Sequence, residues 1–160
     1  EKGIQSRKLK HMVRNPDPLR DWLALREIEK LLKEESFDLV HTHTSKAGVL
    51  GRIAARKAGL PSVHTAHGHV FYGYFGKLLT NLFVHVERMM ARSTRKLISL
   101  TDIETMESLE RGIGVKEQYV TIPSGVPVVR YRNIPEEEGR LFRVRHGIEK
   151  NDFVFLSVGR

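Results

Sequence analysis

The chain has 160 residues, enough for one compact domain with a hydrophobic core. It has no cysteine, which excludes disulfides and thiolate chemistry and fits a cytosolic protein, and no apolar run of about 18 residues that would suit a membrane-spanning helix. The 27 Lys and Arg residues against 19 Asp and Glu residues give a net charge of +8, which suits an anionic partner. The first residues, EKGIQSRKLK, are too polar for a signal peptide and lack an initiator Met, so we expect the natural N-terminus to lie upstream.

The first predicted element is an amphipathic helix that follows Asp17. Asp17 can act as its N-cap, and Pro18 suits the first helical position. The apolar residues that recur at helical spacing are Leu19, Trp22, Leu23, Ile28, Leu31 and Leu32. A short β-favouring run, FDLVHTH, follows and predicts a strand.

A second helix is predicted over SKAGVLGRIAARKAG, with Ser45 as its N-cap candidate and with Gly59 and Pro61 closing it. Its expected buried stripe consists of Val49, Leu50, Ile53 and Ala54. Another short strand, SVHTAH, comes next, and it is followed by the loop GHVFYGYFG, which is rich in glycine and aromatic residues.

The same alternation of helix and strand continues to about residue 123. KLLTNLFVHVERMMARS and TDIETMESLERG are predicted helices, and RKLISL and YVTIP are predicted strands. Thr101 and Glu104 fit a capping box, and Gly112 ends that helix. Such alternation implies parallel strands joined by right-handed helical crossovers, hence an α/β fold with a doubly wound parallel sheet.

The pattern changes beyond the loop SGVPVVRYRNIP. We expect an incomplete domain over 1–134, a charged helical connector over 135–152, and the first strand of a second, truncated domain over 153–160. The sequence FVFLSVGR is the basis for that last strand. The chain is thus expected to be cut at both ends.

Five of the eight histidines occur in two short segments at strand ends: His41, His43, His64, His67 and His69. Ligands of open parallel sheets bind beyond the carboxyl ends of the strands, so both segments point to one crevice. Residues two apart on a strand share a face, which groups His41 with His43. For His41 and His64, which lie inside strands, we favour a structural role in satisfying backbone groups.

Two chemical interpretations of these segments stay open. The first is a histidine zinc site, although neither segment contains the carboxylate that hydrolase zinc sites usually include. The second is a polar crevice for an organic ligand. In the adjoining segment SKAG, the unpaired amides of a helix start could admit an anion, or Gly48 and Gly51 could simply allow close helix packing.

Several motifs occur in the order found in one family. FDLVHTHTSKAGVLGRIAARKAGLPSVHTAHG resembles the middle of the N-terminal domain of a retaining glycosyltransferase of family 4, with GT-B architecture. LISLTD and VTIPSGV resemble later turns of that domain, with Thr101 and Ser124 as departures from the usual residues. FVFLSVGR resembles the first strand of the C-terminal domain.

This resemblance implies two Rossmann-like domains facing each other across a cleft, with the acceptor mainly on the N-terminal side and a nucleotide sugar, a UDP-sugar by preference, on the C-terminal side. It implies that His67 reaches the donor sugar and orients it, which makes His67 the catalytic candidate. Arg160 matches an arginine that pairs with the donor diphosphate, so that no metal is needed. The other candidates for donor or acceptor binding are His43, Ser45, Lys46, Gly68, Thr101, Ser124, Gly125 and Gly159.

The resemblance also implies bacterial polysaccharide or envelope glycan synthesis, with a glycan or polyprenyl-linked acceptor. The 160-residue chain alone is expected to be inactive, because the resemblance places the rest of the donor site after Arg160. The aromatic loop over 70–75 and the basic helix after it suit an anionic membrane surface, so a cytoplasmic protein attached peripherally to the inner face of the membrane is expected.

Three competing functions are kept. A metal-dependent α/β hydrolase would use the histidines as ligands. A polyanion-binding domain is suggested by charge alone, but the basic residues are spread over most helices with no recognition motif, so no nucleic-acid partner is expected. A non-catalytic relative that binds nucleotide sugars has the same sequence signature as an active transferase over this part of the chain.

Overall fold

The computed structural model describes residues 3, 5–67 and 76–157. The chain divides into two units, Glu1–Ser124 and Gly125–Arg160, and each is described by itself. The first unit thus ends upstream of the boundary predicted at residue 134. Most of the predicted aromatic loop and the last three residues lie outside the described residues.

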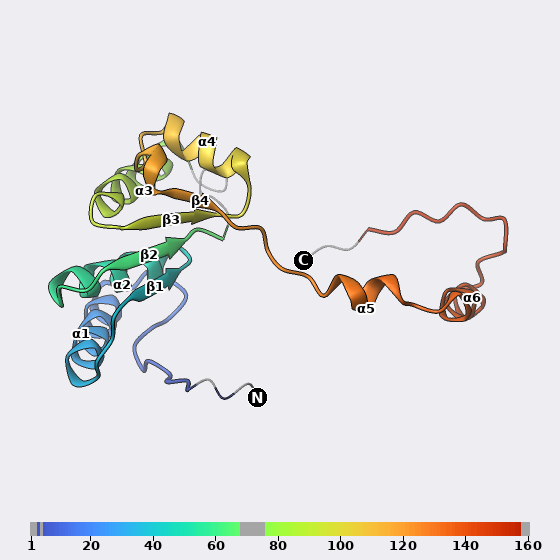
Figure 1. Cartoon of the computed structure of the whole chain (residues 1–160), viewed down its shortest axis with the longest axis horizontal. Helices are drawn as coiled ribbons and strands as arrows, with labels where there is room; N and C mark the ends of the chain where they lie inside the picture. The colour runs from blue at the N-terminus through green and yellow to red at the C-terminus, as the bar shows by residue number, and fades with distance from the viewer. Residues whose placement is uncertain (1–2, 4, 68–75, 158–160) are drawn as a thin grey trace. The chain divides into compact units, whose positions relative to one another are not determined.

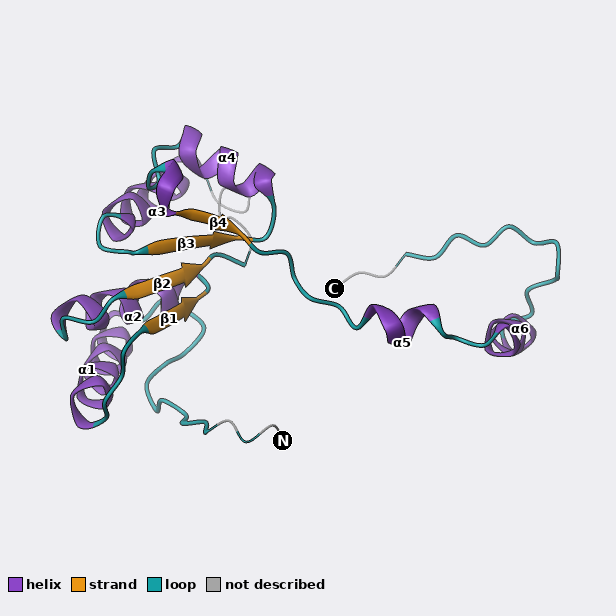
Figure 2. Ribbon diagram, in the orientation of Figure 1, coloured by secondary structure: helices purple, strands orange, loops and turns teal. Residues whose placement is uncertain are grey.

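The first unit is a parallel sheet covered by helices (Figures 1 and 2). All three strand pairings are parallel, and the strands lie in the consecutive order β1-β2-β3-β4. The elements are α1 (Pro18–Glu34), β1 (Val40–His43), α2 (Ser45–Lys57), β2 (Ser62–Thr65), α3 (Lys77–Ala91), β3 (Lys96–Ser99), α4 (Asp102–Glu110), a 3-10 turn (Lys116–Gln118) and β4 (Tyr119–Thr121). The predicted alternation and the parallel α/β sheet are confirmed.

Local signals fix several helix ends where the sequence predicted them. The Asp17 side chain accepts a hydrogen bond from the Arg20 amide, so it caps α1. Thr101 caps α4 by accepting from the Glu104 amide, and the Glu104 carboxylate accepts from the Leu100 amide. Gly59 and Gly112, which follow α2 and α4, have positive φ angles of 70° and 67°, the conformation that glycine adopts without strain.

The buried faces of α1 and α2 are narrower than their apolar patterns. Leu19 and Trp22 of α1 are 68% and 56% exposed, and the residues that α1 buries are Ala24 and Glu29. In α2, the predicted stripe is confirmed for Leu50 and Ala54 and wrong for Val49 and Ile53, which are only half-buried. The residues that α2 buries are Gly48, Leu50, Gly51, Arg52, Ala54 and Ala55.

Helix α2 lies unusually close to the sheet because its buried face carries glycines. A Cβ atom added at Gly48 would lie 2.5 Å from Cε1 of His64, and one added at Gly51 would lie 2.7 Å from Cγ2 of Thr42. No real Cβ atom tolerates such distances, so both positions require glycine for packing. Of the two interpretations of this segment, close helix packing is the one that the structure supports.

The core of the first unit continues on the α3 side of the sheet. A cluster of Val84, Ala91, Leu97 and Ile113 is packed by Tyr119, whose hydroxyl donates to the Ile113 carbonyl at 2.9 Å. Arg52 of α2 is also buried and forms two hydrogen bonds, of 2.9 and 2.8 Å, to the carboxylate of Glu87 in α3. This ion pair ties the two helices together.

The second unit contains two helices. α6 (Glu136–Arg145) occupies the predicted connector, and α5 (Val128–Arg132) forms where a loop was expected. Residues 153–157 form no strand. A strand needs a neighbour to satisfy its backbone groups, and none of the described segments pairs with 153–157. Its assignment to the start of a further domain stays a prediction.

Candidate functional site

The histidine segments meet at the carboxyl edge of the sheet. β1 and β2 are neighbours, and His43 stands opposite Thr65 in their register. Because side chains alternate along a strand, His41, His43 and Thr65 project from one face, and Thr42 and His64 project from the other, beneath α2. The expectation that His41 and His43 share a face is confirmed by their ring centroids, which lie 4.2 Å apart.

Three imidazole rings form a continuous cluster at this edge. Nδ1 of His43 and Nε2 of His67 lie 2.8 Å apart in a hydrogen bond, and their ring centroids are 5.1 Å apart. Nε2 of His41 lies 2.9 Å from the hydroxyl oxygen of Thr65. His43 and His67 are both exposed, so the cluster offers polar nitrogen atoms to solvent or to a ligand.

The histidines also differ in how strongly burial lowers the pKa of the imidazole ring. His64 is 3% exposed, and Nδ1 of its ring lies 2.9 Å from the Thr42 hydroxyl. Burial, together with the guanidinium of Arg52, lowers the pKa of His64 to about 3, so this ring is neutral at physiological pH. Partial burial and the neighbouring rings of His43 and His67 also lower the pKa of His41. His64 thus has the structural role that was expected, but it bonds the side-chain hydroxyl of Thr42, where a backbone group was expected.

Thr44, which sequence reasoning overlooked, carries backbone strain beside the cluster. Its φ of 62° and ψ of 167° lie in a region that is essentially restricted to glycine. Thr44 is also the N-cap residue of α2, so the predicted cap at Ser45 is wrong: Ser45 is the first helical residue, and the Thr44 side chain makes no cap hydrogen bond. No sequence signal marks this strain, because threonine is a common residue in strands and caps.

Lys46 does not join the histidine cluster. Its ammonium group forms an ion pair with Asp21 of α1 and donates to the Asn15 carbonyl at 2.5 Å. Its predicted contact with a ligand stays a prediction, and so does that of Ser45, which is half-buried at the start of α2.

The remaining predicted residues are distributed over several places. Thr101 follows β3 and Ser124 follows β4, so both lie at the same edge as the histidines. Gly125 opens the second unit. Gly68, Gly159 and Arg160 lie outside the described residues.

A second polar cluster at the ends of β3 and β4 was not foreseen. The Thr121 hydroxyl donates to the Asp102 carboxylate at 2.6 Å, and the hydroxyl oxygen atoms of Ser99 and Thr105 lie 2.5 Å apart. Asp102 could have been singled out because it follows a predicted strand at the same edge as the histidines. The short polar bonds organise the turn between β3 and α4.

A metal centre finds no support in the described residues. Within 5–67 and 76–157, no group of three or more His, Asp or Glu side chains is arranged to hold an ion. Since Nδ1 of His43 and Nε2 of His67 face each other, these two nitrogen atoms occupy each other's lone-pair directions. Within the described residues, the polar ligand crevice therefore stays a prediction, and the zinc site lacks a third ligand.

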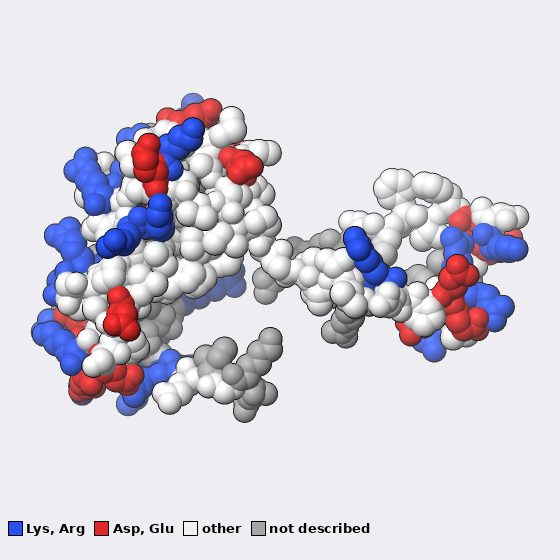
Figure 3. Space-filling view, viewed as in Figure 1, with Lys and Arg blue, Asp and Glu red and all other residues white. Residues whose placement is uncertain are grey.

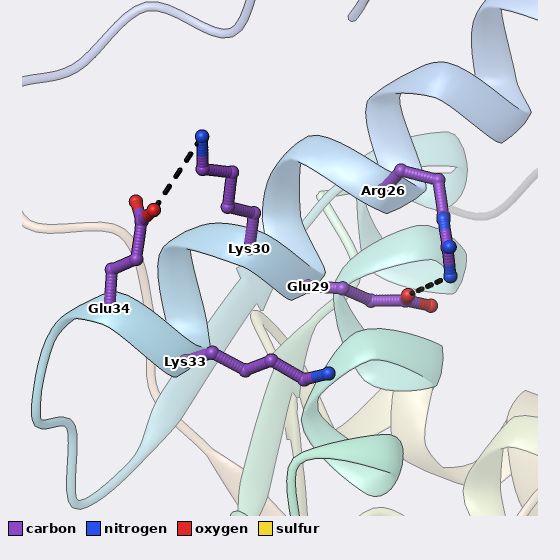
Figure 4. Close-up of a pocket in the computed structure, with 5 residues that line it drawn as sticks. All are labelled: Arg26, Glu29, Lys30, Lys33 and Glu34. Carbon is purple, nitrogen blue, oxygen red and sulfur yellow. Dashed lines mark hydrogen bonds and ion pairs between the residues drawn. The ribbon is translucent and has the colours of Figure 1, made fainter.

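In the view of Figure 3, the Lys and Arg residues of the first unit lie mainly over the side away from the strand tips. A hollow on α1, drawn in Figure 4, is lined only by charged residues: Arg26, Glu29, Lys30, Lys33 and Glu34. There Arg26 pairs with Glu29, and α1 leads into the start of β1, so this hollow belongs to the amino edge.

A parallel α/β sheet with polar side chains beyond its carboxyl edge defines a Rossmann-like ligand-binding domain. The family model described as Glycosyltransferase Family 4 matches residues 2–130, and the chain belongs to that family. The fold class predicted from the resemblance, the N-terminal part of a GT-B architecture, is confirmed.

Similar proteins agree with this assignment. The chain is 38% identical over 156 residues to the Escherichia coli UDP-Gal:alpha-D-GlcNAc-diphosphoundecaprenol alpha-1,3-galactosyltransferase, covering 93% of this chain and 38% of that protein. It is 26% identical over 149 residues to the alpha-monoglucosyldiacylglycerol synthase of Acholeplasma laidlawii, covering 86% and 37%. The chain thus spans less than two fifths of the length of these relatives.

Solved structures show the same fold. Anabaena HepE in complex with UDP superimposes with a TM-score of 0.66 at 23% identity, covering 78% of this chain and 32% of that one. HepE in complex with UDP-glucose gives a TM-score of 0.62. At this identity the likeness establishes the fold alone.

Proposed function

We propose that this chain is the acceptor-side part of a retaining glycosyltransferase that moves a sugar from a UDP-sugar to a glycan or lipid-linked acceptor in bacterial polysaccharide or envelope glycan synthesis. The observation that carries the proposal is the exposed His43–His67 pair at the carboxyl edge of a family 4 domain. Support for the substrates comes from the E. coli relative, named for UDP-Gal and a diphosphoundecaprenol acceptor, and from HepE, which binds UDP and UDP-glucose.

In the proposed reaction the bond between the sugar C1 and the diphosphate oxygen breaks, and UDP leaves with the electron pair. A hydroxyl oxygen of the acceptor forms the new bond on the same face of the sugar, and its proton passes to the departing diphosphate oxygen of UDP. His67 hydrogen-bonds a donor hydroxyl and fixes the sugar for attack, an orienting role for which a neutral imidazole suffices.

Residues other than the histidines are proposed to neutralise the negative charge of the diphosphate. We assign the neutralisation of the leaving group to Arg160 and to residues of the longer protein, without a metal. Gly68, Gly159, Thr101, Ser124 and Gly125 are proposed to take part in donor or acceptor binding as well. The chain alone is proposed to be inactive for this reason.

The test uses the protein expressed to its natural ends. Thermal-shift titrations with UDP-glucose, UDP-galactose, GDP-mannose and ADP-glucose are run with and without EDTA. We expect stabilisation by one UDP-sugar that survives EDTA, and a much smaller shift in a His67→Ala variant. The absence of a shift with every nucleotide sugar, together with a loss of stability in EDTA, would contradict the proposal.

We further propose that the protein attaches to the inner face of the membrane through α3. Leu78, Leu82 and Met89 follow helical spacing on one face of α3 and are 87%, 56% and 42% exposed, with Lys77 and Arg92 nearby in the chain. No helix within the described residues is long and apolar enough to cross a membrane. Apolar side chains beside cations suit an anionic bilayer surface.

Vesicle flotation tests this attachment. The protein is expected to float with phosphatidylglycerol vesicles at low salt and to lose most of that binding when Leu78→Glu and Leu82→Glu are combined. Ile103→Glu replaces an exposed apolar residue of a different helix, α4, and serves as the control. It should float as the unmodified protein does. Equal flotation of both variants would count against the α3 surface.

A further inference from the structure

We propose that His43 is a positioning residue that holds the His67 imidazole in place at the carboxyl edge and fixes its tautomer. The proposal rests on the function proposed for His67, the contact with the donor sugar. Its central observation is the hydrogen bond of 2.8 Å between Nδ1 of His43 and Nε2 of His67, with the two rings inclined by only 26°.

His67 needs such support because it lies beyond the regular strand. β2 ends at Thr65, and the next amide, that of Ala66, donates to the Ile98 carbonyl at the long distance of 3.4 Å. The His67 side chain is exposed, so no packed core fixes its rotamer. An orienting group that is free to rotate loses most of its effect on a bound sugar.

His43 is well placed to supply that support. It is the last residue of β1, and the next amide, that of Thr44, donates to the Thr65 carbonyl at 3.3 Å. On its other side the ring contacts His41, which is itself fixed by the buried Thr65 hydroxyl at 2.9 Å. His67 is thus connected through His43 and His41 to a hydroxyl inside the sheet.

The bond also links the protonation of the two rings. A nitrogen–nitrogen hydrogen bond holds one proton between its two atoms, so either His43 donates from Nδ1 or His67 donates from Nε2. In either arrangement the free nitrogen of His67, Nδ1, has a defined character as a donor or an acceptor toward a sugar hydroxyl. Without His43, both tautomers and several rotamers of His67 become accessible.

Two substitutions at His43 separate the hydrogen bond from the ring contact. His43→Phe keeps an aromatic ring between His41 and His67 but removes Nδ1. His43→Asn removes the ring but places an amide atom on Cγ, where Nδ1 is attached in histidine. If the hydrogen bond positions His67, His43→Asn should keep the His67 ring in place, and His43→Phe should not. His146→Gln, a histidine substitution in the second unit, is the control.

Nitrogen-15 NMR of the histidine-labelled full-length protein reads the tautomer directly, with the His67 signals assigned from a His67→Gln variant. We expect one tautomer in the unmodified protein, His43→Asn and His146→Gln, and signals averaged between tautomers in His43→Phe. With UDP-galactose or UDP-glucose as donor, kcat/KM should fall about tenfold in His43→Phe and less than about threefold in His43→Asn.

A His67 spectrum that is the same in His43→Phe and in the unmodified protein would overturn the proposal, as would equal losses of kcat/KM in the two His43 variants. The NMR measurement needs no substrate, so it decides the positioning role even if transfer is absent. Full transfer by His67→Gln would instead contradict the function proposed for His67 and leave the spectral result intact.

Discussion

At the scale of single residues, the contact between Gly48 and His64 decides how closely α2 packs on the sheet. Gly48→Ala adds a methyl group 2.5 Å from a ring atom of His64. The cost of that overlap exceeds the gain from replacing a helical glycine, so we expect a loss of about 1–2 kcal/mol in the free energy of unfolding. Urea denaturation measures it.

A double-mutant cycle provides the control for this substitution. In a His64→Ala background the obstructing ring is absent, so Gly48→Ala should become neutral or stabilising. The same loss in both backgrounds would show that the strain comes from elsewhere in α2.

His64 also predicts acid sensitivity. Its pKa is lowered from 6.5 to about 3 in the folded chain, so the unfolded chain binds the proton more readily. The folded state therefore keeps its full advantage above about pH 6.5 and loses about 1.4 kcal/mol per pH unit as the pH falls toward 3. Unfolding free energies measured between pH 7 and 4 should show this slope.

Substitution of His64 by Gln, which does not titrate in this range, should flatten the pH dependence although it lowers stability at pH 7. His85→Gln, at an exposed position of α3, should leave the slope unchanged. A slope that persists in His64→Gln would assign the acid sensitivity to another group.

At the scale of elements, the buried ion pair between Arg52 and Glu87 links α2 to α3. The Arg52 side chain has no exposed surface and that of Glu87 is 16% exposed. Glu87→Ala would leave a buried cation without its carboxylate, and we expect a loss of about 3 kcal/mol. Thermal or urea unfolding of the variant gives this value.

Two comparisons make that prediction specific. The double variant Arg52→Met, Glu87→Leu removes both charges and should lose less stability than Glu87→Ala alone. Glu34→Ala breaks the exposed pair with Lys30 in α1 and should cost less than about 0.5 kcal/mol. A small loss for Glu87→Ala would mean that water reaches Arg52.

The elements also show what sequence can predict here. Caps and terminal glycines act through neighbouring residues, so Asp17, Thr101 and Gly112 could be recognised in advance. The burial of Arg52 could not, because its partner lies 35 positions away in another helix. The exposure of Trp22 shows the same limit: an apolar stripe indicates a helix but not what covers it.

The sequence likewise predicts some features of the candidate site and not others. Alternation along β1 predicted that His41 and His43 share a face, and the parallel sheet predicted that His67 lies nearby. The hydrogen bond between His43 and His67 depends on strand register and rotamers, which periodicity does not specify. The strain at Thr44 has no sequence signature at all.

At the scale of the whole molecule, the two units should differ in local stability. α6 has no buried residue, whereas α2 has six. Helices without a buried face are marginal in water, so amides of 136–145 should exchange with solvent far faster than those of α2. Hydrogen exchange of the chain, followed residue by residue, measures this; equal protection in α2 and α6 would contradict it.

The backbone of Thr44 has a consequence for laboratory evolution. Its conformation costs about 1–3 kcal/mol, and glycine would relieve much of that cost. A library screened only for heat resistance should therefore enrich glycine at position 44. A library screened for sugar transfer should retain threonine, because glycine would loosen the chain next to His43. The two selections would therefore favour different residues at position 44. Comparing their sequences would show that thermal stability and transfer activity make opposite demands there.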